Sequence, residues 1–370
     1  MSRPPAILQV LPALESGGVE RGTLEIAEAI AAAGYRAIVA SAGGRLVPEL
    51  EALGATHVTL PLLTKSPMGI WRNAARLAEI ATREQVSIIH ARSRAPAWSA
   101  LRAARRSGAH FVTTYHGTYG EGWPGKRLYN SVMARGERVI AISRHIADHI
   151  RRLYGDGERI RVIPRGVDPR RFDAARVEPS RVAALRAAWS LPDGAQVALL
   201  PARMTRWKGH DVLIRALDRL PGVVAVLAGD VAGRQRYVEE LRALAEGRGV
   251  AGRLRFAGHV SDMPAAMLAA DVVIHASTEP EAFGRTVTEA QALGRPVIAS
   301  DLGGPRETVE DGVTGWLIPP GDAVALSDAI ARVLAMRAEE LAAIGEAARR
   351  GVPTLEAMQN ATLAVYRELL

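Results

Sequence analysis

A strand–helix–strand unit at the start of the chain restricts the possible folds more than any other feature. The apolar run PAILQVLP (residues 5–12) predicts a buried strand, residues 19–33 predict a helix that ends at Gly34, and YRAIVAS (residues 35–41) predicts the next strand. Strands joined in this way run parallel, and their connection is right-handed. We therefore expect an α/β fold built on a parallel sheet.

The same alternation continues along the rest of the chain. In the first half, short apolar runs predict strands at residues 87–91, 110–116 and 138–143, and helices are predicted at residues 70–83, 95–107 and 144–153. In the second half, strands are predicted at residues 196–202, 223–229, 254–258, 271–276, 296–300 and 315–318, with helices in the intervals. The second half therefore repeats the alternation of strands and helices seen in the first half, but not its sequence.

The length of 370 residues is enough for about two domains. Residues 165–180 are rich in Pro and Arg and weak in periodicity, so we place the linker there. We predict an N-terminal Rossmann-like domain over residues 1–170, a C-terminal Rossmann-like domain over residues 171–352, and a final helix over residues 353–370. Two such sheets joined by a short linker would leave a cleft, and clefts between domains are common ligand sites.

The composition excludes several classes of protein. The chain has no cysteine, so it has neither a disulfide framework nor a thiolate metal site. It contains no run of about 18 uncharged apolar residues, and its first residues lack the apolar core of a signal peptide. We therefore expect a cytoplasmic protein without a membrane span. No metal is expected, because the spacing of the histidines is not that of metal ligands at His90, His145, His149, His210, His259 and His275.

The net charge of +8 is unevenly distributed. Residues 1–170 hold 24 Lys and Arg against 14 Asp and Glu, a net charge of +10, whereas the remaining 200 residues hold 23 against 25, a net charge of −2. An excess confined to one half indicates an anionic partner for that half, which leaves open a membrane surface, nucleic acid or an acidic substrate. The competing explanation is a high-GC genome that favours Arg, but this does not account for the asymmetry.

Residues 279–294 (EPEAFGRTVTEAQALG) follow one predicted strand and open a helix, which is the ligand end of an α/β sheet. Gly284 lets the backbone approach a ligand closely. An anion is favoured at such a helix start, where the amides belong to Arg285, Thr286 and Val287. Glu281 and Glu289 flank it, and ionised carboxylates accept hydrogen bonds from hydroxyl groups. The predicted ligand has a central diphosphate with sugar hydroxyls at both ends, as in a sugar nucleotide.

A second basic loop follows the first predicted strand of the second half. In ARMTRWKGHD (residues 202–211), Arg203 and Lys208 are five residues apart, and Gly209 opens a helix. Two cations beside a helix start suit a diphosphate. A solvated basic loop is the alternative, although the equivalent position of the Glu281 loop in the same sheet favours a site.

Two weaker candidates lie in the first half. Gly17 and Gly18 give a tight turn between the first strand and helix, but neither a dinucleotide-binding glycine fingerprint nor a phosphate-binding loop is present, and an ordinary turn is the alternative. His116, before Gly117, follows the strand FVTTY and would donate to a substrate oxygen or carry a switchable charge. A structural role is the alternative for a lone histidine.

Three segments of the first half combine aromatic and basic residues, as surfaces that lie on anionic lipid do. Their members are Trp71, Arg72 and Arg76; Trp98, Arg102, Arg105 and Arg106; and Trp123, Lys126, Arg127 and Tyr129. Alternatively, the tryptophans belong to the core and the arginines to solvated helix faces.

Taken together, these residues resemble a family. The chain looks like a retaining glycosyltransferase of family 4, also called group 1, which has the GT-B fold of two Rossmann-like parallel-sheet domains facing each other across a cleft. The most specific matches are EPEAFGRTVTEA with its E-x7-E spacing, GRPVIASDLGGPRETV (residues 294–309) and DGVTGWLIPPGD (residues 311–322). The supporting matches are GGVER, the His116–Gly117 pair, IPRGVD (residues 163–168) and ARMTRWKG, so the resemblance covers essentially the whole chain.

The resemblance implies a role for each candidate site residue in the second half of the chain. Glu281 resembles the carboxylate that contacts the donor sugar, and Glu289 the one that binds the ribose diol. Arg203 and Lys208 resemble the pair on the diphosphate. The backbone around Glu281 completes the implied donor site at Ala282, Phe283, Gly284, Arg285 and Thr286.

In the first half, Gly17 and Gly18 resemble the loop near the diphosphate and the acceptor. His116 resembles the residue beside the donor sugar at the reacting centre, so the implied catalytic residues are His116, Glu281, Arg203 and Lys208. The final helix resembles one that crosses back onto the first domain. Arg165 departs from the family's usual Asn in IPRGVD, which we expect to add charge near the cleft and to alter the acceptor.

The implied function is transfer of a hexose-type sugar, with retention and without a metal or other cofactor, from a UDP- or GDP-sugar. The expected acceptor is a glycan or lipid-linked glycan of lipopolysaccharide or another part of the cell envelope, reached from the cytoplasmic face of the inner membrane. A small soluble acceptor is the main alternative. A non-catalytic binding protein and a nucleic-acid-binding protein are remote alternatives; no nucleic-acid-binding motif is present.

Overall fold

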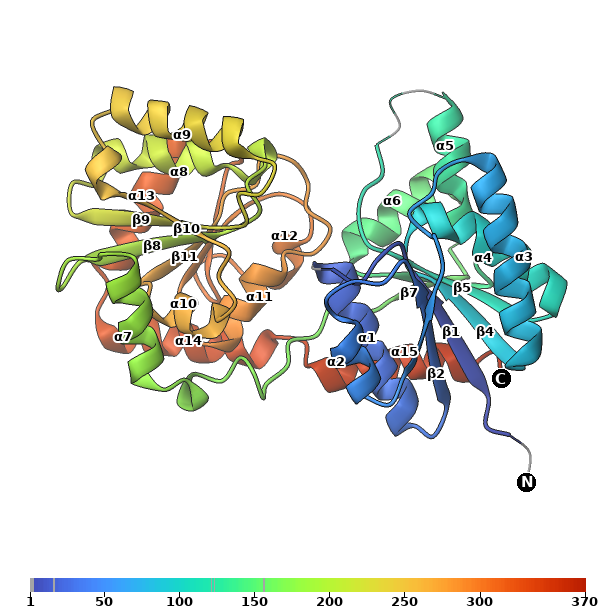
Figure 1. The fold of residues 1–370 in the computed structure, drawn as a ribbon. Helices are drawn as coiled ribbons and strands as arrows, with labels where there is room; N and C mark the ends of the chain where they lie inside the picture. Colours follow the sequence, from blue (N-terminus) through green and yellow to red (C-terminus); the bar gives the residue numbers. More distant parts are fainter. Residues whose placement is uncertain (1–2, 16, 121, 123, 156) are drawn as a thin grey trace. The chain divides into compact units, whose positions relative to one another are not determined.

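The computed structural model describes residues 3–15, 17–120, 122, 124–155 and 157–370 (Figure 1). The chain forms two compact units: Met1–Gly166 together with Leu355–Leu370, and Val167–Thr354. Each unit has one fully parallel sheet with helices on both faces. The predicted α/β class with two parallel sheets is therefore confirmed.

The sheet of the N-terminal unit has seven strands in the order β3-β2-β1-β4-β5-β6-β7. These strands are β1 (Ala6–Val10), β2 (Arg36–Ser41), β3 (Thr56–Thr59), β4 (Val86–Ala91), β5 (His110–Tyr115), β6 (Arg138–Ala141) and β7 (Ile160–Val162). In the register, Gln9 of β1 lies opposite Val39 of β2 on one side and His90 of β4 on the other. The chain therefore reverses its direction of travel across the sheet between β1 and β4.

Right-handed connections decide which helix covers which face of this sheet. Connections that lead from one strand to the next toward β3 place their helices on one face, and connections that lead toward β7 place theirs on the opposite face. Helices α1 (Gly18–Ala32), α2 (Val47–Ala52) and α15 (Leu355–Arg367) form one apolar core with the strands. The opposite face carries α3 (Pro67–Arg83), α4 (Arg94–Ser107), α5 (Pro124–Asn130) and α6 (Arg144–Tyr154) (Figure 1). A short 3₁₀ helix, Ser131–Ala134, follows α5.

The sheet of the second unit has the strand order β10-β9-β8-β11-β12-β13. These strands are β8 (Gln196–Pro201), β9 (Val223–Ala228), β10 (Leu254–Gly258), β11 (Val272–His275), β12 (Val297–Ser300) and β13 (Trp316–Ile318). Helices α8 (His210–Ala216), α9 (Gln235–Gly247) and α13 (Ala323–Leu334) pack on one face. The other face carries α7 (Pro179–Ala188), α10 (Met263–Leu268), α11 (Arg285–Ala292) and α12 (Pro305–Thr308). Helix α14 (Ala338–Gly351) contacts α11 and packs Leu341 and Ile344 against the core of the first face.

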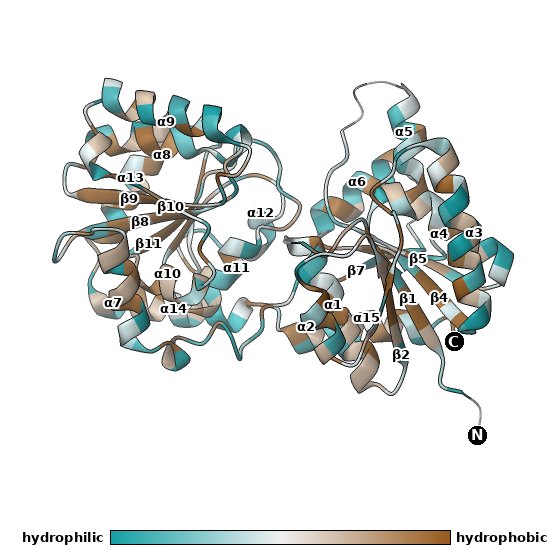
Figure 2. Ribbon diagram, viewed as in Figure 1, coloured by the Kyte–Doolittle hydropathy of each residue, from teal (hydrophilic) through white to brown (hydrophobic). Residues whose placement is uncertain are grey.

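The central strands are apolar along their whole length because helices cover both of their faces. All five residues of β1 and all six of β9 are buried. Figure 2 shows the strands as mostly hydrophobic and the helices as a mixture of hydrophobic and hydrophilic residues. Continuous apolar runs are typical of parallel sheets, which explains why the central strands are visible in the sequence.

The sequence prediction missed the edges of the N-terminal sheet. Strand β3 (THVT) and strand β7 (IRV) are short and partly exposed, so neither has the continuous apolar run of a buried strand. The short helix α2 was missed as well. Edge elements are covered on fewer sides, and their sequences carry a correspondingly weaker signal.

The connections between the two units are short. The boundary between Gly166 and Val167 lies inside the segment predicted as the linker, but α7 already begins at Pro179. The predicted helix over residues 353–370 is helical only from Leu355 to Arg367. Val167 N donates to Pro353 O at 2.9 Å, so the two connecting segments run side by side in the second unit.

Candidate functional site

The reversal of strand order marks the ligand end of each sheet. It falls between β1 and β4 in the N-terminal unit and between β8 and β11 in the second unit. In open α/β sheets, ligands bind outside the carboxyl ends of the strands at such a point. The Lys208 loop follows β8 and the Glu281 loop follows β11, so the second unit's topology brings these two predicted segments together.

Glu281 lies at the centre of a buried polar cluster. Its Oε2 atom accepts hydrogen bonds from Lys208 Nζ at 2.7 Å, His275 Nε2 at 2.5 Å and Ser277 Oγ at 3.3 Å. Burial would raise the pKa of Glu281, but His275 and Lys208 outweigh it, so the pKa of this carboxyl lies well below its usual range. Glu281 is therefore ionised and fixed in position, with 22% of its side chain exposed.

Lys208 is a buried cation with a defined position. Its Nζ atom lies 4.3 Å from the centre of the Trp207 ring, and only 10% of its side chain is exposed. Burial lowers the pKa of Lys208, an effect that Glu281 opposes and the nearby charge of Arg203 reinforces. Arg203 itself is exposed, so the pair combines one buried cation with one solvent-facing cation.

Close backbone approaches hold the loops of this site together. A Cβ atom on Gly209, which has φ +71°, would lie 1.9 Å from Ala276 O. Thr278 N donates to Trp207 O at 2.7 Å and joins the same two loops. Glu281 O accepts from Gly304 N at 2.7 Å and links its loop to the one after β12. Three loops are thus fixed to one another by their backbones.

The predicted helix start after Glu281 is present as α11. Gly284 precedes the helix with φ +86°, a conformation that favours glycine, and Arg285 Nε lies 3.4 Å from Glu289 Oε1. The amide of Val287 was expected to point toward a ligand. Instead, Val287 N donates an internal hydrogen bond to Gly284 O at 3.0 Å. The amides of Arg285 and Thr286 belong to the first turn, and Ala282 and Phe283 precede Gly284.

Gly17 and Gly18 lie at the start of α1 in the N-terminal unit. Gly17 caps the helix with φ +136°, and its carbonyl accepts from Arg21 N at 3.0 Å. Their position after β1, beside the reversal point of that sheet, is the one that the sequence predicts. Their assignment to one site with Glu281 stays a prediction.

His116 follows β5 directly and is half-buried. Its Nε2 atom is screened from water and has no hydrogen-bond partner within the described part of the chain. Burial lowers the pKa of His116 well below its usual range, and the charges of Arg92 and Arg165 act in the same direction. The imidazole is therefore neutral near pH 7, which contradicts a role as a switchable charge and leaves the role of a hydrogen-bonding group.

The structure corrects the expectation for Arg165. This side chain is buried, and its Nη2 atom donates to Glu25 Oε2 at 3.0 Å and to Gly18 O at 3.1 Å. Gly22 makes room for it, because a Cβ atom there would lie 2.1 Å from Arg165 Nη2. Arg165 therefore forms an internal ion pair that ties residue 165 to α1, rather than adding a free charge.

Sequence reasoning missed three polar residues at the carboxyl ends of the strands. His275 ends β11, Ser277 follows it, and Arg92 follows β4. Arg92 is buried, and its Nη1 atom donates to Gln9 Oε1 at 3.1 Å. Their position at or just after the ends of apolar strands was the available signal, but their burial became apparent only in the folded chain.

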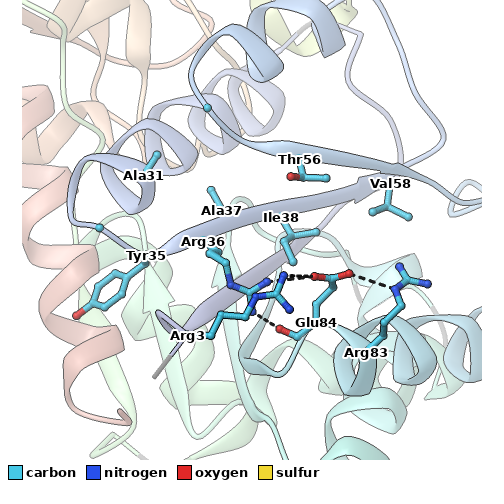
Figure 3. Close-up of a pocket in the computed structure, with 12 residues that line it drawn as sticks. Arg3, Ala31, Tyr35, Arg36, Ala37, Ile38, Thr56, Val58, Arg83 and Glu84 are labelled. Carbon is cyan, nitrogen blue, oxygen red and sulfur yellow. Dashed lines mark hydrogen bonds and ion pairs between the residues drawn. The ribbon is translucent and has the colours of Figure 1, made fainter. Parts of the chain in front are cut away.

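A separate hollow of about 410 Å³ lies at the opposite end of the N-terminal sheet (Figure 3). Arg36 begins β2 and Glu84 precedes β4, so this hollow is at the amino ends of the strands. Arg3, Arg36 and Arg83 all donate to Glu84. Because its cations share this carboxylate, we interpret the cluster as a structural clamp.

Comparisons with known proteins decide the family. The profile described as Glycosyltransferase Family 4 matches residues 16–171, and that described as Glycosyl transferases group 1 matches residues 182–351. A glycosyltransferase from Rickettsia africae is 36% identical, with a TM-score of 0.92 over 100% of this chain and 99% of that one. This chain belongs to the group 1, family 4 glycosyltransferases.

Two further comparisons place this family 4 glycosyltransferase among its relatives. The Anabaena protein Alr3699/HepE, solved with UDP and glucose, is 26% identical, with a TM-score of 0.87 over 98% of this chain and 100% of that one. The D-inositol 3-phosphate glycosyltransferase of Xylanimonas cellulosilytica is 38% identical over 226 residues, which are 59% of this chain and 54% of that protein. The matched region thus spans about half the length of that relative. The predicted GT-B fold is confirmed by these likenesses.

Within the described residues, no group of three or more His, Cys, Asp or Glu side chains is arranged to hold a metal ion. No helix in the described part of this family 4 glycosyltransferase is long and apolar enough to cross a membrane.

Proposed function

We propose that this family 4 glycosyltransferase moves a hexose-type sugar from a UDP- or GDP-sugar to a hydroxyl group of an acceptor. The observation that carries the proposal is the Glu281–Lys208 pair at the reversal point of the second sheet. It combines a fixed acceptor for sugar hydroxyls with a fixed cation for a diphosphate. Its relative HepE, solved with UDP and glucose, supports a nucleotide-sugar donor.

In the proposed reaction, the bond between the anomeric carbon and the diphosphate oxygen breaks, and negative charge develops on the leaving diphosphate. Lys208, Arg203 and the first amides of α11 would stabilise this charge without a metal ion. One well-placed donor of this kind contributes about 2.7–4 kcal/mol to the barrier. Glu289 would bind the ribose diol at the other end of the donor.

We propose that the reaction retains the configuration of the anomeric carbon. Glu281 is engaged by Lys208 and His275 and is thus a poor candidate for a nucleophile. The acceptor oxygen would attack from the face that the diphosphate leaves, and its proton would pass to a diphosphate oxygen. Neutral His116 would donate a hydrogen bond to the donor sugar beside the reacting carbon, and Gly17 and Gly18 would lie near the diphosphate and the acceptor.

For the acceptor, we propose a glycan or lipid-linked glycan of the cell envelope, such as lipopolysaccharide, reached at the cytoplasmic face of the inner membrane. The N-terminal net charge of +10 supports an anionic surface. A small soluble acceptor is the second candidate, because a relative is named for D-inositol 3-phosphate. Nucleic acid and a non-catalytic role stay remote alternatives.

A donor-hydrolysis screen over UDP- and GDP-sugars tests the proposal, because hydrolysis needs no acceptor. We expect one donor to be hydrolysed, with the same rate in EDTA, and the rate to fall at least a hundredfold in Lys208→Ala. Glu279→Ala is the matched control, since Glu279 is exposed in the same loop. Absence of hydrolysis and binding for every donor, or a control as impaired as Lys208→Ala, would contradict the proposed site.

A further inference from the structure

Exposed apolar side chains gather on one part of the N-terminal unit. Leu63, Met68, Trp71 and Leu128 are each between 53% and 63% exposed. The first precedes α3, the next two lie three residues apart on α3, and Leu128 lies on α5. Single exposed apolar residues need no explanation, but such a group indicates a surface that binds something.

Helix α4 connects the two parts of this group. Ser99 Oγ donates to Ile70 O of α3 at 2.9 Å, and Trp98 Nε1 donates to Tyr129 O of α5 at 3.1 Å. The start of α3 and the end of α5 therefore both lie against the amino-terminal half of α4. Of the tryptophans predicted for a lipid surface, Trp71 is exposed, Trp98 is half-buried as a link between helices, and Trp123 lies outside the described residues.

The positive charge of the N-terminal half is concentrated in the same segments. Residues 61–83, 94–107 and 124–130 together hold ten Lys and Arg and a single acidic residue, Glu79, a net charge of +9. Residues 1–170 as a whole have a net charge of +10. The asymmetry is therefore a local property of α3, α4, α5 and the loop before α3.

We infer that the surface formed by Leu63, Met68, Trp71, Leu128 and the basic residues of these segments binds an anionic lipid membrane. This inference rests on the proposed function, because it assigns the place where a lipid-linked acceptor is approached. Apolar side chains enter the boundary between headgroups and acyl chains, while Lys and Arg remain among anionic headgroups. Nucleic acid would account for the charge and for Trp71, which can stack on a base, but not for exposed Leu63, Met68 and Leu128.

The test is co-sedimentation of the full chain with vesicles of phosphatidylcholine alone and with one-third phosphatidylglycerol. We expect binding only to the anionic vesicles. Neutralising Lys65 or Arg72 to Gln should weaken binding about fivefold each, since one basic residue near the surface contributes about 1 kcal/mol. Trp71→Ser with Leu128→Ser should abolish the part of the binding that survives 0.5 M salt.

Matched controls come from the second unit. Val313→Ser with Val324→Ser removes two apolar side chains that are 45% and 50% exposed, and Arg234→Gln with Arg236→Gln removes two exposed charges. Equal losses in the control and test variants, or tight RNA binding that survives Trp71→Ser and Leu128→Ser, would overturn the inference. Donor hydrolysis by the same variants separates the two proposals, because it tests the proposed function without a membrane.

A second observation concerns the attachment of the final helix. Tyr366 of α15 is fully buried, and its hydroxyl lies 2.6 Å from His90 Nδ1 on β4. His90 Nε2 lies 2.7 Å from Thr114 Oγ1 on β5. Side chains two residues apart along an extended chain share a face, so this relay sits directly before Arg92, which follows β4, and His116, which follows β5.

The geometry points to Tyr366 as a positioning residue that fixes the carboxyl ends of β4 and β5, and thereby the ring of His116. The role depends on the proposed function of His116. Burial lowers the pKa of His90, so the relay is uncharged near pH 7 and its hydrogen bonds do not vary with physiological pH. Replacing the hydroxyl would loosen the relay while the aromatic packing remains.

Tyr366→Phe tests this role, with Thr362→Val as the matched control. The Thr362 hydroxyl is buried in the same helix and donates to Met358 O of that helix at 2.9 Å. We expect Tyr366→Phe to lower kcat about tenfold with an unchanged donor KM and to shift the NMR signals of the His116 ring. We expect the effects of Thr114→Val and Tyr366→Phe on kcat to be non-additive, because both substitutions break the same relay.

The inference fails if Tyr366→Phe lowers only the stability, or if it changes kcat and the ring signals no more than Thr362→Val does. A His116→Ala variant with full transfer activity would instead refute the proposed role of His116. The NMR readout is independent of activity, so the two failures are distinguishable.

Discussion

Lys208 Nζ lies 2.7 Å from Glu281 Oε2, although the two residues are 73 positions apart in the sequence. Each comes from a loop at the carboxyl end of a strand, and those strands, β8 and β11, are neighbours in the sheet. The pair therefore exists because the strand order reverses at this point. It gives a buried cation a fixed position beside the loop that precedes α11.

We predict that Glu281→Gln lowers turnover at least a hundredfold while the second unit stays folded. The amide keeps the shape of the side chain but loses the charge that positions Lys208 and His275, and loss of one preorganised group typically costs a factor of 100 to 1,000. Steady-state kinetics with the donor found in the hydrolysis screen measures this loss, and circular dichroism checks the fold. Wild-type turnover would contradict the assignment of Glu281.

We predict that Gly209→Ala destabilises the second unit by more than about 2 kcal/mol and weakens donor binding. The new Cβ would meet Ala276 O at 1.9 Å in addition to the strain of φ +71°. Gly194→Ala is the control, because Gly194 has φ +68° and open space around it, so that it reports the strain alone. Urea unfolding compares the two, and equal costs would show that the contact between the loops is unimportant.

We predict that Arg165→Met destabilises the N-terminal unit by about 3–5 kcal/mol, the usual cost of breaking a buried ion pair from one side. The variant leaves Glu25 without this partner, so Glu25→Gln in the same chain should recover part of the loss. Arg350→Met is the control, since the Arg350 and Glu346 side chains are 67% and 65% exposed. An exposed pair costs less than about 1 kcal/mol. Chemical denaturation measures the free energy of unfolding of Arg165→Met, of the double variant with Glu25→Gln, and of Arg350→Met.

We predict that His210 makes the second unit less stable in mild acid. Burial lowers the pKa of His210 from 6.5 to about 4, so the unfolded state binds a proton more readily than the folded state. Its contribution is fully present above pH 6.5 and is lost as the pH falls from 6.5 toward 4, by no more than about 3 kcal/mol. The free energy of unfolding of His210→Gln should therefore change less than that of the wild type over this range. An identical pH dependence in both proteins would refute this prediction.

Burial of polar groups is the main feature that could not be predicted from the sequence. His275 ends the apolar strand β11 and Arg92 follows the apolar strand β4, and nothing in their local sequence shows that they are buried. Arg165 was predicted to add charge, yet it is neutralised by Glu25, 140 positions earlier in the chain. Such partners come from distant segments. Arg165 meets Glu25 because α1 packs against the segment after β7.

The sequence by itself determined the α/β class, the central strands and the loops that carry Glu281, Lys208 and His116. Local periodicity and strand ends specify these features, because buried parallel strands require continuous apolar runs and ligand loops follow them. Only the tertiary structure decided that Glu281 is held ionised by Lys208 and His275, that His116 is neutral, and that Tyr366 reaches His90. These properties depend on burial and on contacts between segments far apart in the chain, which set the local electrostatics and are absent from any single stretch of sequence.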